Sequence, residues 1–146
     1  MTERYHDQAP PGLAAAPGYS QVVSASGRLV FVAGQVALNE EGTVIGHGDV
    51  VRQAEQVFEN LDRALDAAGA SFSDVVKLNY YFIDISALPP VRLVRDRYVD
   101  TARPPASTAV EVTGLARPEF LIEIEAQAII DVAGEAGLPH GPPPAG

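Results

Sequence analysis

The sequence contains no cysteine, and this absence excludes several kinds of chemistry. Without cysteine there is no disulfide framework, no thiol nucleophile and no cysteine-ligated zinc site. The three histidines do not compensate, because His6 and His140 lie in the terminal tails and His47 lies between two glycines. We therefore expect neither a Ser-His-Asp triad nor a histidine metal site.

Positive charge is scarce, and long apolar runs are absent. The chain has 10 Lys+Arg against 19 Asp+Glu, a formal net charge of −9 at pH 7. An acidic surface repels phosphate backbones and anionic membranes, so no nucleic acid and no membrane partner is expected. No apolar run approaches the roughly 18–20 residues that span a bilayer. Residues 1–11 also lack the apolar core of a signal peptide, which predicts a cytoplasmic protein.

A length of 146 residues predicts one domain that is large enough to bury a core. Residues 1–17 are rich in proline, alanine and glycine and are predicted to form a flexible arm. Residues 133–146 form a tail rich in proline and glycine, a composition that suits neither a helix nor the interior of a sheet. The folded domain is therefore predicted to span residues 18–132.

Apolar spacing predicts two helices. Residues 49–68 carry apolar side chains at intervals of three and four, and Gly69 follows as a C-terminal stop. A second helix is predicted after Ser86, which would cap it, with Pro89 and Pro90 tolerated in the first turn.

Six strands are predicted from short apolar or alternating runs. Residues 19–25 and 29–33 flank Ser-Gly-Arg, a hairpin signal, and the remaining strands are expected at residues 44–45, 75–84, 106–112 and 119–131. Two helices can cover one face of the mixed six-stranded sheet that these strands would form. The predicted fold class is therefore α/β (α+β), a two-layer sandwich.

The face of the sheet away from the helices is predicted to be mixed. In residues 119–131 apolar side chains alternate with Glu123, Glu125 and Gln127, as in a half-buried strand. Counting by alternation adds further residues to this face: Lys77, Asn79, Tyr81, Ser107, Ala109, Glu111, Val75, Ile83 and Ile129. A half-apolar face needs a partner, so we predict a homo-oligomer whose sheets pack together.

Several motifs resemble the Rid family (YjgF/L-PSP type) of imine deaminases. Residues 105–112 read Pro-Ala-Ser-Thr-Ala-Val-Glu-Val, and residues 122–126 read Ile-Glu-Ile-Glu-Ala, similar to the C-terminal signature of that family. Gly-Tyr-Ser-Gln at 18–21, Val-Ala-Gly-Gln at 32–35 and Ala-Ala-Gly at 67–69 resemble three further family motifs in the same order. The resemblance runs from about residue 19 to residue 130.

The resemblance implies a homotrimer with a chorismate-mutase-like fold and clefts at the subunit interfaces. It implies small-molecule substrates, imines or enamines such as 2-aminoacrylate, which water converts to a 2-oxo acid and ammonia. It also implies that no cofactor, metal or organic, is needed.

Two residues of the family site remain, Glu123 and Tyr19, and Gly34 is a further candidate. By resemblance Glu123 holds the nucleophilic water and moves protons, and a carboxylate on a half-buried strand suits acid–base work. By resemblance Tyr19 lies at the mouth of the cleft, and Gly34 could offer its backbone N–H to a ligand. The alternatives are an interface ion pair for Glu123, a packing aromatic for Tyr19 and a turn glycine for Gly34.

Three positions depart from the family pattern. Ser107 replaces the arginine that clamps the substrate carboxylate, a task for which a planar guanidinium is suited. Ala109 stands where the deaminases often have cysteine, and Ala33 replaces a serine. These substitutions resemble an arginine-lacking branch. Arg103 and Arg92 are possible substitutes for the missing clamp, although most arginines are solvated or in surface pairs.

Two function hypotheses follow. The first is an enzyme that hydrolyses a small imine, an enamine or a related reactive carbonyl compound, and loss of the arginine favours a substrate without a simple α-carboxylate. The second is a non-catalytic trimeric protein that binds a small ligand or has a regulatory role; a specialised pathway enzyme of the same fold is a further alternative. Family members are also described as endoribonucleases, but the net charge of −9 and the lack of a basic stripe argue against RNA.

Overall fold

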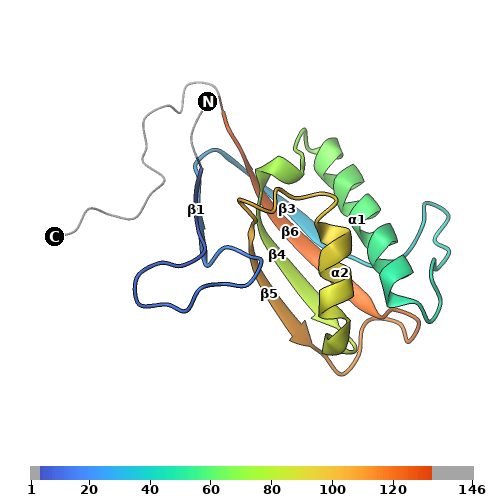
Figure 1. Ribbon diagram of the computed structural model, residues 1–146. Coiled ribbons are helices and arrows are strands. Elements are labelled where there is room, and N and C mark those ends of the chain that lie inside the picture. The colour runs from blue at the N-terminus through green and yellow to red at the C-terminus, as the bar shows by residue number, and fades with distance from the viewer. Residues whose placement is uncertain (1–3, 133–146) are drawn as a thin grey trace.

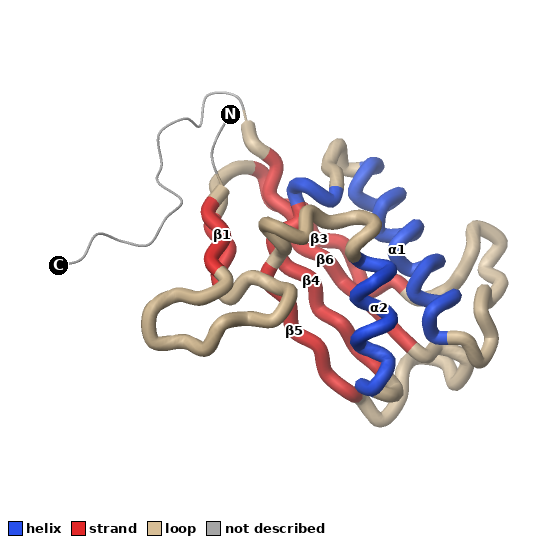
Figure 2. The backbone as a smooth tube through the Cα atoms, viewed as in Figure 1, coloured by secondary structure: helices blue, strands red, loops and turns tan. Residues whose placement is uncertain are grey.

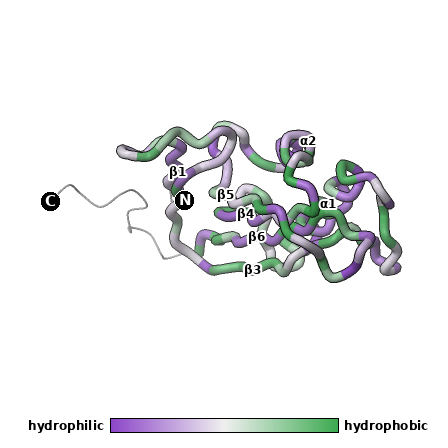
Figure 3. Tube along the Cα trace, turned by 90° about the horizontal axis from the view of Figure 1, so that it is seen from below, coloured by the Kyte–Doolittle hydropathy of each residue, from purple (hydrophilic) through white to green (hydrophobic). Residues whose placement is uncertain are grey.

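The computed structural model describes residues 4–132 as two helices packed on one side of a four-stranded sheet. Figures 1 and 3 show both helices on the same side of this sheet. Its strand order is β3-β6-β4-β5, in which β4 and β5 run parallel and the other neighbours run antiparallel. The predicted α+β fold with a mixed sheet is therefore confirmed. The elements of this unit are β3 (Arg28–Gln35), α1 (Val50–Ala67), β4 (Val75–Phe82), α2 (Leu88–Arg95), β5 (Ala106–Glu111) and β6 (Ile122–Ile130).

The prediction of a single six-stranded sheet is wrong, because two strands form a sheet of their own. β1 (Tyr5–Asp7) pairs antiparallel with β2 (Val22–Ser24), and both lie away from the helices (Figure 2). The predicted hairpin does not form either, since β3 pairs with β6 rather than with β2. At Gly27, with φ +142°, an added Cβ would lie 2.0 Å from the carbonyl oxygen of Ile130. This glycine therefore lets the chain pass close to the end of β6. Residue Val44, predicted in a strand, forms only an isolated bridge with Leu38.

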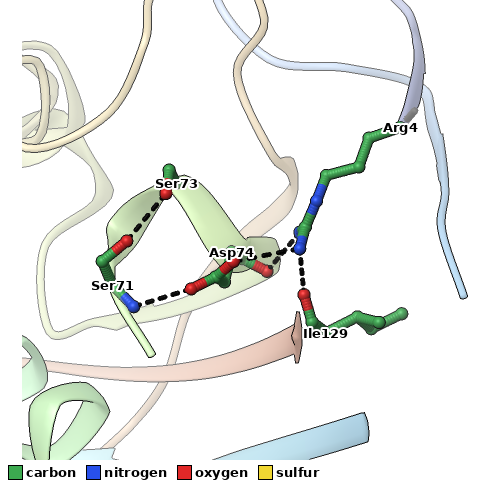
Figure 4. A network of polar contacts seen from close by, with 5 residues as sticks. All are labelled: Arg4, Ser71, Ser73, Asp74 and Ile129. Carbon is green, nitrogen blue, oxygen red and sulfur yellow. Dashed lines mark hydrogen bonds and ion pairs between the residues drawn. The ribbon is translucent and has the colours of Figure 1, made fainter. Parts of the chain in front are cut away.

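Part of the N-terminal segment, predicted as a flexible arm, is held against the domain through Arg4 (Figure 4). The Arg4 guanidinium donates to the Asp74 carbonyl at 2.9 Å, to the Asp74 carboxylate at 3.0 Å and to the Ile129 carbonyl. A guanidinium carries five N–H donors in a fork, which allows one side chain to join several acceptors. The predicted tail, residues 133–146, lies outside the described residues.

Helix α1 begins and ends close to the predicted residues. The Asp49 carboxylate caps it by accepting the Arg52 N–H at 3.0 Å. Gly69, with φ +77°, ends it, and the Ala70 N–H returns to the Leu65 carbonyl at 2.9 Å. Its apolar stripe, predicted at intervals of three and four, is buried at Ala54, Phe58, Leu61 and Leu65. No helix of residues 4–132 is long and apolar enough to cross a bilayer.

The predicted cap of the second helix is wrong. Asp84, not Ser86, provides the cap, and it caps a short 3-10 turn, Ile85–Ala87, that precedes α2. The Asp84 carboxylate accepts both the N–H of Ser86 at 2.9 Å and its hydroxyl at 2.6 Å. The N-cap residue of α2 is Ala87, whose side chain cannot accept a hydrogen bond, and α2 begins at Leu88 with its two prolines in the first turn.

The core lies between the helices and the sheet and contains a cluster of aromatic rings. Phe58 of α1 stacks on Tyr98 at 5.4 Å between ring centroids, and Phe72 contacts both rings. One polar side chain, Gln53, is fully buried in this layer. It donates to the carbonyls of Gly46 and Glu119 and accepts the N–H of Leu121, which satisfies the amide without solvent.

No helix of residues 4–132 covers the other face of the sheet, and the residues on this face differ in part from those predicted. Ser107 lies opposite the buried Leu78, so Thr108 rather than Ser107 shares the open face with Asn79. For the same reason Ala109 and Glu111 also belong to the helix side, which corrects the alternation count. The register between two strands is set by their pairing and cannot be counted along one of them. The pairing of β4 with β6 also shifts register just after Val75. The side chain of Val75 therefore lies in the core and not on the open face as predicted.

Candidate functional site

Glu123 lies directly against Gly34 on the open face of the sheet. β3 changes register between Val32 and Gln35, and this irregularity contains Ala33 and Gly34, both exposed. A Cβ added to Gly34 would lie 2.7 Å from Oε2 of Glu123. The φ of Gly34 is not positive, so the glycine is needed for space rather than for its backbone conformation. None of the described residues donates a hydrogen bond to the Glu123 carboxylate.

Glu125 shares this face but is engaged in hydrogen bonds. Its Oε1 accepts the Asn79 amide at 3.0 Å and the Tyr81 hydroxyl at 2.8 Å. The hydrogen bond to Glu125 is also the main reason that the pKa of Tyr81 is raised. Glu111 in turn accepts the N–H of Ile85 at 3.0 Å. Both carboxylates thus hold neighbouring chain segments, whereas Glu123 is left with unused acceptor capacity.

A surface pocket of about 640 Å³ reaches the backbone of Gly34. The amide of Asn60 on α1 shapes it by donating to the carbonyls of Val36 and Leu38. The lining carries one cation and one anion, so it presents no strong net charge. The lining residues are Gly34, Gln35, Val36, Leu38, Asn39, Glu40, Asn60 and Arg63.

Tyr19 belongs to a second group of predicted site residues, beside β5. Its segment runs along the start of this strand, because Ser20 forms a parallel bridge with Ala106. The guanidinium carbon of Arg92 lies 5.9 Å from the centroid of the Tyr19 ring. Arg95, one turn further along α2, donates to the Gly18 carbonyl at 2.6 Å and so holds the turn before Tyr19.

Ser107 and Ala109 lie on the same side of β5 as the helices, beside Leu78 and Tyr80. Tyr80 is only 2% exposed, and its hydroxyl makes no hydrogen bond with a described residue. Burial raises the pKa of Tyr80, while the charges of Arg95 and Arg92 act in the opposite direction. Alternation places Tyr80 in the core, but nothing in the sequence marks its hydroxyl as unpartnered, so the residue was missed as part of this group.

Arg103 is the remaining predicted site residue, and it is exposed. Its guanidinium donates to the backbone carbonyl of Arg4, so it contacts the N-terminal segment. Within the chain the predicted residues therefore fall into separate groups. Glu123, Gly34 and Ala33 gather at the bulge of β3, whereas Tyr19, Arg92, Ser107 and Ala109 lie at the β5 edge on the helix side.

The family model described as Endoribonuclease L-PSP matches residues 8–130. The chain belongs to this family, the Rid (YjgF/L-PSP) family. Protein DfrA of Myxococcus xanthus is 38% identical to this Rid protein over 126 residues, covering 86% of this chain and 92% of DfrA. The 2-iminobutanoate/2-iminopropanoate deaminase of Mus musculus is 34% identical over 111 residues, covering 76% of this chain and 80% of the mouse protein. The crystal structure of the Rid family protein YyfB from Yersinia pestis superposes with a TM-score of 0.75 at 35% identity, covering 87% of this chain and 98% of YyfB.

Proposed function

We propose that this Rid protein hydrolyses small imines or enamines to a carbonyl compound and ammonia, with Glu123 as the acid–base group. The observation that carries this proposal is the Glu123 carboxylate, packed over the backbone of Gly34 without a hydrogen bond from any described residue. A carboxylate with free acceptor capacity beside an exposed backbone can hold a water molecule. The similarity to a mammalian iminobutanoate deaminase supports the same chemistry.

The reaction needs one proton carrier. Glu123 takes a proton from water while the water oxygen bonds to the imine carbon; the electron pair of the C=N bond moves to the nitrogen, to which Glu123 delivers that proton. In the resulting carbinolamine Glu123 takes the hydroxyl proton as the C=O bond forms, and returns it to the nitrogen as the C–N bond breaks and ammonia leaves. General acid–base catalysis of this kind contributes roughly 10²- to 10⁴-fold in rate.

The proposal includes a homotrimer in which two subunits complete each cleft. The open face supports it, because Leu29 and Phe31 of β3 are 61% and 71% exposed and form an apolar surface that a second copy can cover. Glu123 of one subunit would then meet the β5 edge of another. In this arrangement Ser107 stands at the position of the family's clamp arginine, which defines an arginine-lacking branch.

Ammonia release from freshly generated 2-aminoacrylate and from bulkier enamines tests the proposal. Glu123→Gln is expected to lower turnover by about 10²-fold or more. Glu125→Gln is the matched control, because its amide oxygen can still accept from Asn79 and Tyr81 on the same strand face. Full activity of Glu123→Gln would overturn the assignment. No turnover by a well-folded wild-type oligomer would favour the alternative, a non-catalytic ligand-binding or regulatory protein.

A further inference from the structure

Two arginines that lie one turn apart on α2 differ in whether their guanidinium groups have hydrogen-bond and ion-pair partners. Arg95 is buried and committed, since it donates to the Gly18 carbonyl at 2.6 Å and pairs with Asp96 at 2.7 Å. Arg92 is half-buried, and its guanidinium carbon lies 5.9 Å from the centroid of the Tyr19 ring; it has no hydrogen bond or ion pair with a described residue. An arginine that lies against an aromatic ring but has no anionic partner keeps its N–H donors for a ligand.

Tyr80 adds a second unused donor near these arginines. Its hydroxyl is buried beneath the helix layer without a hydrogen bond to a described residue, an arrangement that folded proteins mostly avoid. Tyr80 lies opposite Ala109 in the sheet register, on the side of β4 that faces the helices, and Arg95 and Arg92 of α2 both act to lower the pKa of its hydroxyl. A phenol is protonated at neutral pH, so it can donate.

We propose that Arg92 binds the acid group of the substrate, in place of an arginine on β5. The proposal rests on the proposed function and specifies its substrate class, namely imines that keep a carboxylate. Ser107 lies on the side of β5 that faces the helices, next to Leu78, and has no positive charge with which to bind a carboxylate. A guanidinium can grip a carboxylate through two parallel hydrogen bonds, and contact with Tyr19 limits the orientations that Arg92 explores before binding.

Arg95 fixes the ring that Arg92 contacts. It donates to the Gly18 carbonyl and so holds the turn before Tyr19 against α2, one turn away from Arg92. Tyr80 lies beside Ala109 in the sheet register, and its hydroxyl, buried without a hydrogen bond to a described residue, is the second donor that the proposal assigns to the acid group.

Binding of pyruvate, the 2-oxo acid product of 2-aminoacrylate, tests the assignment without turnover. Titration calorimetry or NMR shifts would compare the wild type with Arg92→Gln, Arg92→Lys and Tyr80→Phe, using pyruvamide as a neutral ligand of the same size. Arg97→Gln is the matched control, because Arg97 pairs with Glu55 of α1 at 2.8 Å. Arg92→Gln is expected to weaken pyruvate binding by about 10- to 100-fold, and Arg92→Lys by less, with pyruvamide binding unchanged.

Equal pyruvate affinity in the wild type and Arg92→Gln would overturn the inference. A loss of pyruvate binding in Arg103→Gln but not in Arg92→Gln would overturn it too. The inference would also be overturned if the wild type bound pyruvate weakly and pyruvamide more tightly. Glu123→Gln separates this inference from the proposed function. The proposed reaction fails if Glu123→Gln retains full turnover or if the wild type shows no turnover. If Arg92→Gln still loses pyruvate affinity in that case, the acid-binding site stands without the reaction.

Discussion

The two faces of the sheet use polar residues in different ways. On the helix-covered face, Gln53 is fully buried and has a backbone partner for each amide group. On the open face, Phe31 is 71% exposed and Glu123 receives no hydrogen bond from a described residue. The polar groups of the covered face are thus satisfied inside the domain, whereas the open face has exposed apolar surface and a carboxylate that accepts no hydrogen bond from a described residue.

Glu123 and Glu125 show the same contrast at shorter range. They are two residues apart on one strand and point to the same side. Glu125 is occupied by Asn79 and Tyr81, whereas Glu123 faces the bare backbone of Gly34. Local sequence therefore does not separate the two carboxylates; their neighbours across the sheet do.

The contrast between faces is sharpest for two phenylalanines. Phe58→Ala on the covered face should lower the free energy of unfolding by about 3 to 5 kcal/mol, because it leaves a cavity beside Tyr98 and Phe72. Phe31→Ser should leave the stability of the subunit nearly unchanged and weaken its self-association. Urea unfolding and sedimentation would measure these effects, and a large loss of subunit stability in Phe31→Ser would contradict the comparison.

Two glutamines give a polar version of the test. Gln53→Leu should lower the free energy of unfolding by about 1 to 3 kcal/mol, since it leaves the partly buried Glu119 carbonyl and Leu121 N–H without this partner, whereas the Gly46 carbonyl still accepts the Asp49 N–H. Gln127→Leu, an exposed position on the open face, is the matched control and should change little. Equal urea midpoints for both variants would show that the buried amide does not join α1 to the loop before β6.

Gly34→Ala should separate activity from stability. The new Cβ would lie 2.7 Å from Oε2 of Glu123, at the far end of a flexible side chain that can turn aside at little cost in folding. Displacing that carboxylate by about an ångström should lower kcat by about 10- to 100-fold. Steady-state ammonia release and thermal unfolding would be measured on the same sample. Unchanged kcat would mean that Glu123 does not work from the position seen here.

Two tyrosines extend the comparison to alkaline pH. The pKa of Tyr80 is raised by burial, and that of Tyr81 by its hydrogen bond to Glu125. Above pH 10 the unfolded chain loses phenol protons that the folded chain keeps, so stability should fall as pH rises toward the folded pKa. Urea midpoints measured between pH 9 and 11, about one unit either side of the ordinary tyrosine pKa, would show this decline. Tyr80→Phe should reduce the slope more than Tyr81→Phe, and the opposite order would contradict the assignment.

Much of the fold followed from local patterns. The intervals between apolar residues predicted α1 together with Gly69 as its stop, and alternation predicted β6 with its two glutamates on one face. These predictions succeeded because helix and strand periods are properties of a single segment. The family motifs also named Glu123 and Gly34, which the structure places in contact.

Pairing between distant segments could not be read in this way. The hairpin before β3 was predicted from turn residues, yet β3 pairs with β6 about a hundred residues later, as the register Arg28 to Ile130 shows. The count along β5 placed Ser107 on the wrong face, because its orientation depends on Leu78 of the neighbouring strand. Arg4 contacts residues that lie far along the chain, so its role is invisible in the N-terminal sequence.

The sequence by itself determined the elements, the apolar stripe of α1 and the family of this protein, because each depends on short-range spacing or on order along the chain. Only the tertiary structure decided which carboxylate remains without partners, which arginine of α2 is committed and which face Ser107 occupies. These features depend on strand register and on close approach between segments. Register and close approach are set by packing of the whole domain rather than by any one segment.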